Sequence, residues 1–217
     1  MFLDDEIAVL RALKFTLPKI YPITDASISG VSHSEQAEKL VAGGARIIQL
    51  REKRASPREF YESAKQAVET ARKSGIRIII NDRVDIALAL KADGVHLGQD
   101  DMPPEKAREI LGVDAIIGFS THTQAQARKA LDLQVDYVAF GPIFHTRTKE
   151  NPDNVVGLDE LRDVRNIVGD MPLVAIGGIN ADNLSSVFDA GANSAAMIGA
   201  IVSDPSKIEE RMLQLAR

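Results

Sequence analysis

Two carboxylates each follow directly on an apolar run of the sequence. Asp82 ends the stretch RIIIND, and Asp101 ends the stretch GVHLGQDD. Proteins typically hold Mg²⁺ with one or two carboxylates plus phosphate oxygens, so this pair predicts a magnesium site shared with a pyrophosphate-bearing substrate. Alternatively, Asp82 caps a helix over residues 83–90 and Asp101 caps one over residues 103–111. Asp100, next to Asp101, is a further candidate for the same role.

A cluster of cationic and amide side chains lies in the run QLREK. Gln49, Arg51 and Lys53 occupy alternate positions, and Ile48 and Leu50 occupy the positions between them. Because side chains of a strand alternate between its faces, the three polar groups point the same way. Two cations and an amide aimed at one space predict an anion site. The alternative is that Arg51 and Lys53 are solvated and pair with Glu52 or another neighbour.

Other apolar runs end in groups that bind oxygen-rich ligands. These are Asn81, Ser120, Thr146, Thr148 and Lys149, followed by the glycines Gly177, Gly178 and Gly199. Glycine lets backbone N–H groups approach a phosphate closely, and this predicts a second anion site. The Gly-Gly pair is equally explained by a tight turn between a strand and a helix.

These side chains need a scaffold that brings strand ends together. Eight short apolar runs recur, over residues 19–25, 45–52, 76–82, 94–98, 115–120, 137–142, 173–179 and 194–201. Helix-like stretches separate them, over residues 34–44, 57–75, 103–112, 123–133, 157–169 and 180–192. Near-continuous apolar runs are typical of parallel strands buried on both faces. Eight such units predict an α/β fold of the (β/α)8 TIM barrel type, whose active groups lie at the carboxyl ends of the strands. The structural rival is an open doubly wound sheet.

Domain organisation and composition limit the function further. We expect one barrel domain over residues 1–217, with residues 1–18 as a helical extension. The 217 residues are 45% hydrophobic and carry 26 basic against 31 acidic side chains, so we expect no nucleic-acid partner. The absence of cysteine excludes disulfides and thiolate metal sites. We find no apolar stretch of about 18 residues, so we expect no membrane partner and a cytoplasmic location. The oligomeric state stays open, a homo-oligomer included.

From YPITD at Tyr21 to about Ile201, the chain resembles the thiamine-phosphate synthase family. The resemblance rests on QLREK, NDRVDIALALKADGVHLGQDD, GFSTHT, DYVAFGPIFHTRTK, AIGGI and MIGAI, in that order. It implies a barrel that joins 4-amino-5-hydroxymethyl-2-methylpyrimidine pyrophosphate to a thiazole phosphate or its carboxylated form. The products would be thiamine phosphate and pyrophosphate, and the metal would be Mg²⁺.

The resemblance also implies roles for individual residues. Asp82 and Asp101 would bind Mg²⁺. The pyrimidine substrate would be held by Gln49, Arg51, Lys53, Asn81, Ser120 and Lys149, and the thiazole phosphate by Thr146, Thr148, Gly178, Ile198 and Gly199. Bond breaking places negative charge on the departing pyrophosphate and positive charge on the pyrimidine carbon. We therefore expect a dissociative substitution in which Arg51, Lys53, Lys149 and Ser120 are the catalytic set.

Two positions depart from the family pattern, and one histidine supports a rival function. Gly199 stands where serine is expected, and His145 stands where proline is more frequent. His122 would carry the activity of a related branch, the thiazole tautomerases, and a non-catalytic phosphate binder is a third alternative. We expect His145 to be solvated and His96 to be a packed, hydrogen-bonded core group.

Overall fold

The computed structural model describes residues 16–146, 148 and 154–216. Its eight strands are all parallel and form a closed barrel in chain order, with β1 also paired to β8. The strands are Ile20–Asp25 (β1), Ile47–Arg51 (β2), Arg77–Asn81 (β3), Gly94–Leu97 (β4), Ile116–Thr121 (β5), Tyr137–Phe140 (β6), Leu173–Ile176 (β7) and Ser194–Met197 (β8). The (β/α)8 prediction is confirmed, and the pairing of β1 with β8 excludes the open sheet.

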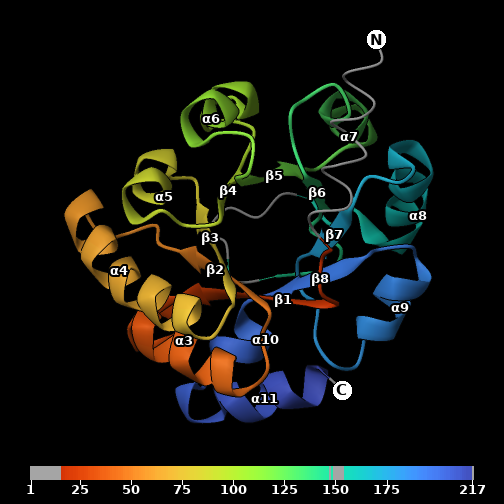
Figure 1. The fold of residues 1–217 in the computed structure, drawn as a ribbon. Coiled ribbons are helices and arrows are strands. Elements are labelled where there is room, and N and C mark those ends of the chain that lie inside the picture. The colour runs from red at the N-terminus through yellow and green to blue at the C-terminus, as the bar shows by residue number, and fades with distance from the viewer. Residues whose placement is uncertain (1–15, 147, 149–153, 217) are drawn as a thin grey trace.

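The helices lie outside this ring of strands (Figure 1). They are Ala26–Ser29 (α2), His33–Ala42 (α3), Pro57–Lys73 (α4), Val84–Leu90 (α5), Pro104–Leu111 (α6), Gln124–Ala130 (α7), Gly157–Val168 (α8), Leu184–Asp189 (α9), Gly199–Val202 (α10) and Ile208–Leu215 (α11), with a short 3₁₀ helix at Pro205–Lys207. Among these described helices, none combines the length and apolar content that a membrane crossing requires.

The apolar core has two layers, separated by the strands. Residues such as Ile48, Leu50 and Ile80 belong to the outer cluster, which includes the apolar faces of the helices. Ile47, Ile79 and residues at matching positions of other strands form a second cluster inside the barrel. The alternation of side chains along each strand therefore supplies both layers, which is why the runs look apolar almost throughout.

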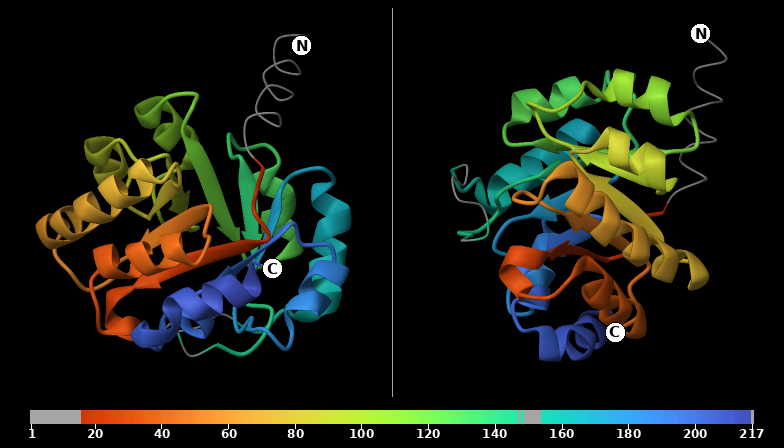
Figure 2. Two further views of the ribbon diagram at one scale, coloured as in Figure 1. Left: turned by 60° about the horizontal axis from the view of Figure 1, so that its bottom comes forward. Right: turned by 90° about the vertical axis from the view of Figure 1, so that its left-hand side faces the viewer.

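Helix ends and helix contacts hold the outer layer in place. Ser56 begins α4 with a reciprocal capping box, in which its side chain and that of Glu59 each bond the other's backbone N–H. The first and last helical units lie side by side in both views of Figure 2, where α3 runs next to α11. Lys39 of α3 donates to the carbonyl of Pro205 at 2.9 Å, which links the two ends of the barrel sequence.

The expected helical extension over residues 1–18 falls almost wholly outside the described residues. Residues 16–18 lead into β1 without helix or strand, so the expected helix does not reach residue 18.

Candidate active site

The carboxyl end of β2 carries its polar side chains on the inner face, as the sequence predicts. Gln49 and Arg51 share a face with Ile47, which lies in the cluster inside the barrel, whereas Ile48 and Leu50 pack in the outer cluster. Gln49 is buried and Arg51 is partly buried. The predicted orientation of this strand is therefore confirmed.

Arg51 forms an ion pair with Asp25, the last residue of β1. The two residues lie opposite each other in the pairing of β1 with β2. Asp25 Oδ1 accepts the N–H groups of Ser27 and Ile28 at 3.0 and 3.3 Å, which fixes the carboxylate at the start of α2. The pair therefore holds the Arg51 guanidinium at the rim of the barrel.

Lys53 forms an ion pair with Asp82, directly after β3. Glu52 accepts the backbone N–H groups of Arg54 and Ala55 at 2.8 and 3.2 Å. The cations of the QLREK run thus pair with carboxylates from neighbouring strand ends. Of the alternative, pairing with Glu52 is wrong, whereas pairing with other neighbours is confirmed.

Asp82 has an unusual backbone conformation. Its φ of 62° lies in the left-handed region, which side chains other than glycine rarely adopt. Its N–H donates to the carbonyl of His96 in β4 at 2.8 Å. Residues held in such conformations concentrate at functional sites, where the surrounding structure fixes them.

Asp101 lies close to Asp82. Burial raises the pKa of the Asp101 carboxyl, the Gly98 N–H opposes this by donating to Oδ2 at 2.7 Å, and the Asp82 carboxylate raises the pKa further. Two carboxylates that interact in this way repel each other when both are ionised, and a cation between them would relieve that repulsion.

The helix-cap alternatives for these two carboxylates are wrong. The cap position before α5 is Arg83, that before α6 is Pro103, and neither helix has a side-chain cap. Asp101 instead accepts the N–H of Gly98 within its own loop, and Asp82 contacts Lys53.

These two carboxylates fit a hard divalent cation, although they do not complete its coordination. Among the described residues, no group of three or more His, Cys, Asp or Glu side chains is placed to hold a metal ion. Mg²⁺ commonly takes one or two carboxylates from the protein and its remaining oxygens from water and substrate phosphates. The two carboxylates match the protein's share of that donor set. Water and the phosphate oxygens of a ligand would supply the remaining oxygens.

Below this rim, a chain of polar side chains crosses the inside of the barrel. Gln49 Nε2 donates to the Tyr21 hydroxyl at 3.1 Å, and the hydroxyls of Tyr21 and Tyr137 lie 2.9 Å apart. His96 Nδ1 lies 2.9 Å from the Tyr137 hydroxyl, and His96 Nε2 lies 2.8 Å from Ser120 Oγ. His96 is therefore a buried, hydrogen-bonded group, as predicted, and it contacts a predicted site residue.

Burial determines the protonation states of the side chains in this hydrogen-bonded series. It lowers the pKa of His96 to about 4, an effect that the Asp101 carboxylate opposes and Lys53 adds to. Burial also raises the pKa of both Tyr21 and Tyr137. At neutral pH the imidazole is therefore uncharged and both phenols keep their protons.

The loops after β6, β7 and β8 meet on the opposite side of the rim. The Thr148 N–H donates to Thr146 Oγ1 at 3.3 Å, and a Cβ built on Gly199 would lie 3.8 Å from Thr148 Oγ1. Gly178 has a φ of 66°, and a Cβ there would lie 2.4 Å from the His145 carbonyl oxygen. Only glycine allows this close approach, so Gly178 has a packing role in addition to any contact with a ligand.

The remaining predicted residues have distinct surroundings. Asn81 is buried and lies opposite His96 in the pairing of β3 with β4. Ile198, at the start of α10, is partly buried and packs on both apolar clusters. The His145 side chain is exposed, as expected. Lys149 lies outside the described residues.

His122, the residue of the rival isomerase, is partly buried beside β6. Its Nδ1 lies 2.7 Å from the carbonyl oxygen of Gly141, so this nitrogen carries a proton that it donates. Its backbone N–H donates to Gln126 Oε1 at 2.7 Å. These contacts fix the orientation of the ring.

Sequence reasoning missed three residues of this region. Asp25 ends the first strand just as Asp82 follows the third, so the strand-end rule would have found it. Tyr21 and Tyr137 occupy inward positions of β1 and β6, in step with Ile23 and Ala139. Polar groups at such positions are a signal that the sequence contains.

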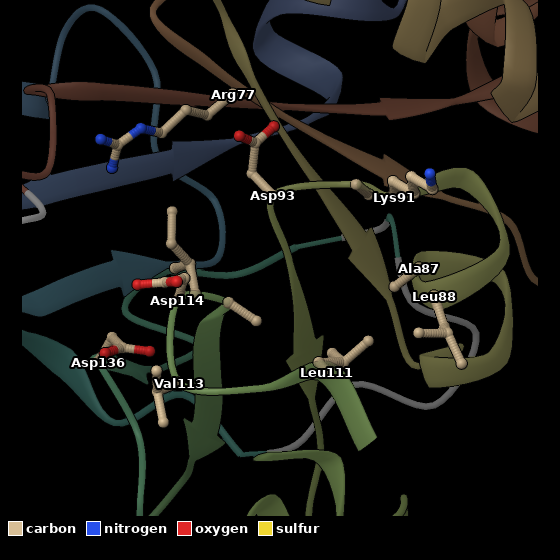
Figure 3. Close-up of a pocket in the computed structure, with 12 residues that line it drawn as sticks. Arg77, Ala87, Leu88, Lys91, Asp93, Leu111, Val113, Asp114 and Asp136 are labelled. Carbon is tan, nitrogen blue, oxygen red and sulfur yellow. The ribbon is translucent and has the colours of Figure 1, made fainter. Parts of the chain in front are cut away.

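A concavity of about 540 Å³ lies at the amino ends of β3, β4 and β5, away from the site described above. Figure 3 shows Asp93, Asp114 and Asp136 at its wall with Arg77, Lys91 and apolar side chains. In TIM barrels that end of the strands serves stability, whereas catalysis takes place at the other end.

Comparison with known proteins gives a consistent family. The model of the thiamine monophosphate synthase family matches residues 20–201. The chain is 44% identical to a thiamine-phosphate synthase of Koribacter versatilis over 204 residues, which cover 92% of this chain and 96% of the relative. It is 45% identical to a thiamine-phosphate synthase of Chloroflexus aurantiacus, with 85% of each chain covered.

A solved structure shows the same arrangement. The thiamine phosphate pyrophosphorylase of Pyrococcus furiosus superposes with a TM-score of 0.81 at 36% sequence identity, and 95% of each chain is covered.

Proposed function

The chain belongs to the thiamine monophosphate synthase family, and we propose that it joins the aminopyrimidine pyrophosphate to the thiazole phosphate at the carboxyl ends of its strands. The reaction forms the bond between the pyrimidine methylene and the thiazole nitrogen and releases pyrophosphate. The product, thiamine phosphate, places the enzyme in thiamine biosynthesis.

One observation carries this proposal: two interacting carboxylates and two cations meet at one rim of the barrel. Asp82 and Asp101 supply the carboxylates, and Arg51 and Lys53 supply the cations. A monophosphate ligand alone would not require this grouping, whereas a pyrophosphate bound with a divalent cation does.

The chain's own residues can stabilise the departing pyrophosphate. As the bond from the methylene breaks, negative charge grows on the leaving oxygen, and fixed cations at that point lower the barrier. Arg51, held by Asp25, and Lys53, held by Asp82, would exchange these carboxylate partners for phosphate oxygens. Lys149 would add a third cation. Asp82 and Asp101 would hold Mg²⁺, which would supply further charge neutralisation to the departing pyrophosphate.

The pyrimidine and thiazole ends need orientation more than proton transfer. Gln49, Asn81 and Ser120 offer hydrogen-bonding groups to the pyrimidine from β2, β3 and β5. Thr146, Thr148, Gly178, Ile198 and Gly199 would position the thiazole phosphate on the other side of the rim, so that the thiazole nitrogen captures the methylene before water does. This dissociative path uses no general base.

The isomerase alternative has less support. Its proton-transferring group would be His122, whose Nδ1–H donates to the Gly141 carbonyl, so that Nε2 would be the nitrogen that exchanges the proton. An isomerase would also leave Asp82, Asp101 and the paired cations without a role.

The test is an incubation of the protein with both substrates and Mg²⁺, followed by oxidation of any thiamine phosphate to its fluorescent thiochrome derivative. We expect product that disappears with a chelator. We also expect Asp82→Ala to lose on the order of 100- to 1000-fold in turnover while remaining folded, because an electrostatic contact to the leaving group is removed.

The matched control is Asp85→Ala, which removes an exposed carboxylate of the same segment that pairs with Arg83. This variant should keep the turnover of the unmodified protein. Turnover that is unchanged in Asp82→Ala at limiting Mg²⁺ would exclude the metal assignment, and absence of product from the folded, Mg²⁺-loaded protein would redirect the search to the carboxylated thiazole and then to the isomerase.

A further inference from the structure

The polar chain inside the barrel joins two residues that the proposed function assigns to the pyrimidine. Gln49 and Ser120 belong to β2 and β5, and Tyr21, Tyr137 and His96 connect them by consecutive contacts of 2.8–3.1 Å. The three connecting side chains are buried. They lie below the rim and have no part in the reaction as proposed above.

The fold makes room for this chain at one position of β5. A Cβ built on Gly118 would lie 2.0 Å from Tyr137 Cζ and 2.5 Å from His96 Nδ1. The rings of His96 and Tyr137 stack there, with centroids 5.5 Å apart and planes 22° apart. The glycine is therefore what allows the two rings to meet.

The number of protons on these side chains indicates which atom donates in each hydrogen bond of the series. Each hydroxyl has one proton, and the uncharged imidazole of His96 has one N–H. In the arrangement where each hydroxyl accepts from one neighbour and donates to the next, Gln49 Nε2 donates to Tyr21, Tyr21 donates to Tyr137, and Tyr137 donates to His96 Nδ1. The N–H of His96 must then be on Nε2, where it donates to Ser120 Oγ. Ser120 is left with its own proton to offer to a ligand, and Gln49 is left with its carbonyl Oε1 as an acceptor beside the second proton of Nε2.

We propose that Tyr21, Tyr137 and His96 are positioning residues that form a directional relay, which makes Gln49 a hydrogen-bond acceptor and Ser120 a hydrogen-bond donor toward the substrate. This proposal rests on the proposed function, because it concerns the same aminopyrimidine. The substrate matches this polarity, since its exocyclic amino group is a donor and its ring nitrogens are acceptors. Because each hydroxyl has a single proton, reversal of one bond favours reversal of the next, which couples the polarity of the two ends.

The first test reads the direction of the relay in the free protein. Nitrogen-15 NMR separates a protonated from a bare imidazole nitrogen, and the His96→Asn variant assigns the His96 signals among the four histidines. We expect the Nε2–H form of His96. The Nδ1–H form would overturn the proposal, because Ser120 would then donate inward to His96. This measurement needs neither substrate nor activity.

The second test reads the consequence for substrate choice. The 4-oxo analogue of the pyrimidine pyrophosphate replaces the amino donor by an acceptor, and we expect the unmodified protein to prefer the amino substrate by about 10- to 100-fold in kcat/KM, since the mismatch leaves a buried polar group unpaired. Tyr137→Phe interrupts the relay and should bring this ratio toward one. Tyr61→Phe is the matched control, because Tyr61 lies on α4 outside the relay, and it should leave the ratio unchanged.

The outcomes separate the relay from the proposed function. A ratio that stays the same in folded Tyr137→Phe would overturn the coupling, and Tyr21→Phe provides the same test if the first variant does not fold. Absence of turnover with either substrate in the unmodified protein would count against the proposed function, and the NMR result would still decide the direction of the relay.

Discussion

The two ends of the barrel use the same acidic residue type in opposite ways. At the amino ends of the strands, Asp93 and Asp136 accept the N–H groups of Ile78 and Ile117 at 2.8 and 2.7 Å, so their oxygens complete the backbone hydrogen bonding of the barrel. At the carboxyl ends, Asp82 and Asp101 face each other. A carboxylate whose lone pairs are used by the backbone stabilises the fold, whereas two carboxylates that repel each other are arranged for a ligand.

Two basic side chains, Arg108 and Lys53, show the same difference between the ends. Arg108 is buried, and its Nη2 donates to Asp136 at 2.6 Å while Nη1 donates to the carbonyls of Gly112 and Val113 at 3.1 and 3.3 Å. The Lys53 side chain, at the other end, keeps 51% of its surface exposed. Arg108 at the amino end is thus enclosed by protein acceptors, whereas Lys53 at the carboxyl end remains accessible to a substrate.

The largest effect should follow from removing Asp136 at the amino end. Asp136→Ala leaves the buried Arg108 charge without its carboxylate and the Ile117 N–H without its acceptor, which should cost about 3–5 kcal/mol in the free energy of unfolding. Denaturant unfolding measures this loss, and turnover per folded molecule should not change. Asp132→Ala, at an exposed position of the same connection, should change neither quantity. A stable Asp136→Ala protein with reduced turnover would remove the distinction between the two ends.

The reverse result is expected from Asp101→Asn at the carboxyl end. The amide keeps an oxygen for the Gly98 N–H but loses the charge, so turnover should fall by about 100- to 1000-fold. Stability should stay level or rise slightly, because the repulsion from Asp82 is removed. Steady-state kinetics and thermal unfolding without Mg²⁺ check the two parts. Asp100→Asn, one position away and exposed, is the control, and a similar loss of turnover there would assign the metal-binding role to Asp100 as well.

Between the two ends, His96 should make stability depend on pH. Its pKa is about 4 in the folded protein and 6.5 as the ordinary value, so the unfolded chain binds more protons between these pH values. Stability should therefore decrease as the pH falls from about 6.5 to about 4, by roughly 3 kcal/mol from this residue. His96→Asn should lose that part of the pH dependence, and denaturant titrations at several pH values compare the two proteins. Equal slopes would show that His96 is protonated in the folded state.

How much the sequence predicts differs between fold and site. The barrel followed from eight apolar runs such as those ending at Glu52 and Asp82, because burial on both faces of a parallel strand leaves a local pattern. The inward orientation of Gln49 and Arg51 followed from parity. The pairing of Tyr21 with Tyr137 joins residues 116 positions apart, and the pairing of Arg51 with Asp25 depends on the register of two strands. No local pattern contains such contacts.

The helix-cap alternatives illustrate the same limit. An aspartate before a helix is a frequent cap, so propensity alone could not decide the roles of Asp82 and Asp101. The left-handed backbone of Asp82 and the Gly98 contact of Asp101 decided against capping. Both depend on how the βα loops close over the strand ends.

The smallest effect tests whether the residue before β4, β6 and β8 has the same role each time, as a side-chain acceptor for a backbone N–H of the barrel. Before β8, Asn193 occupies the place that Asp93 and Asp136 hold before β4 and β6, and its Oδ1 accepts the Leu173 N–H at 2.8 Å. Arg165 Nη1 donates to the same oxygen at 2.8 Å. Asn193→Asp keeps that acceptor and adds a charge beside Arg165, so the free energy of unfolding should change by less than about 0.5 kcal/mol, in the stabilising direction if at all.

Asn193→Ala gives the contrast that makes this small effect informative. It removes the acceptor of the Leu173 N–H and should cost about 1–3 kcal/mol, measured in the same denaturant titration. If alanine and aspartate were equally tolerated, the acceptor oxygen at this position would not contribute to stability. The three amino-end contacts would then have no shared stabilising role. If aspartate were as damaging as alanine, the amide nitrogen of Asn193 would be the important group. Only the combination of a tolerated aspartate and a damaging alanine makes the acceptor oxygen the shared element before β4, β6 and β8, in contrast to Asp82 and Asp101, where the charge itself should matter.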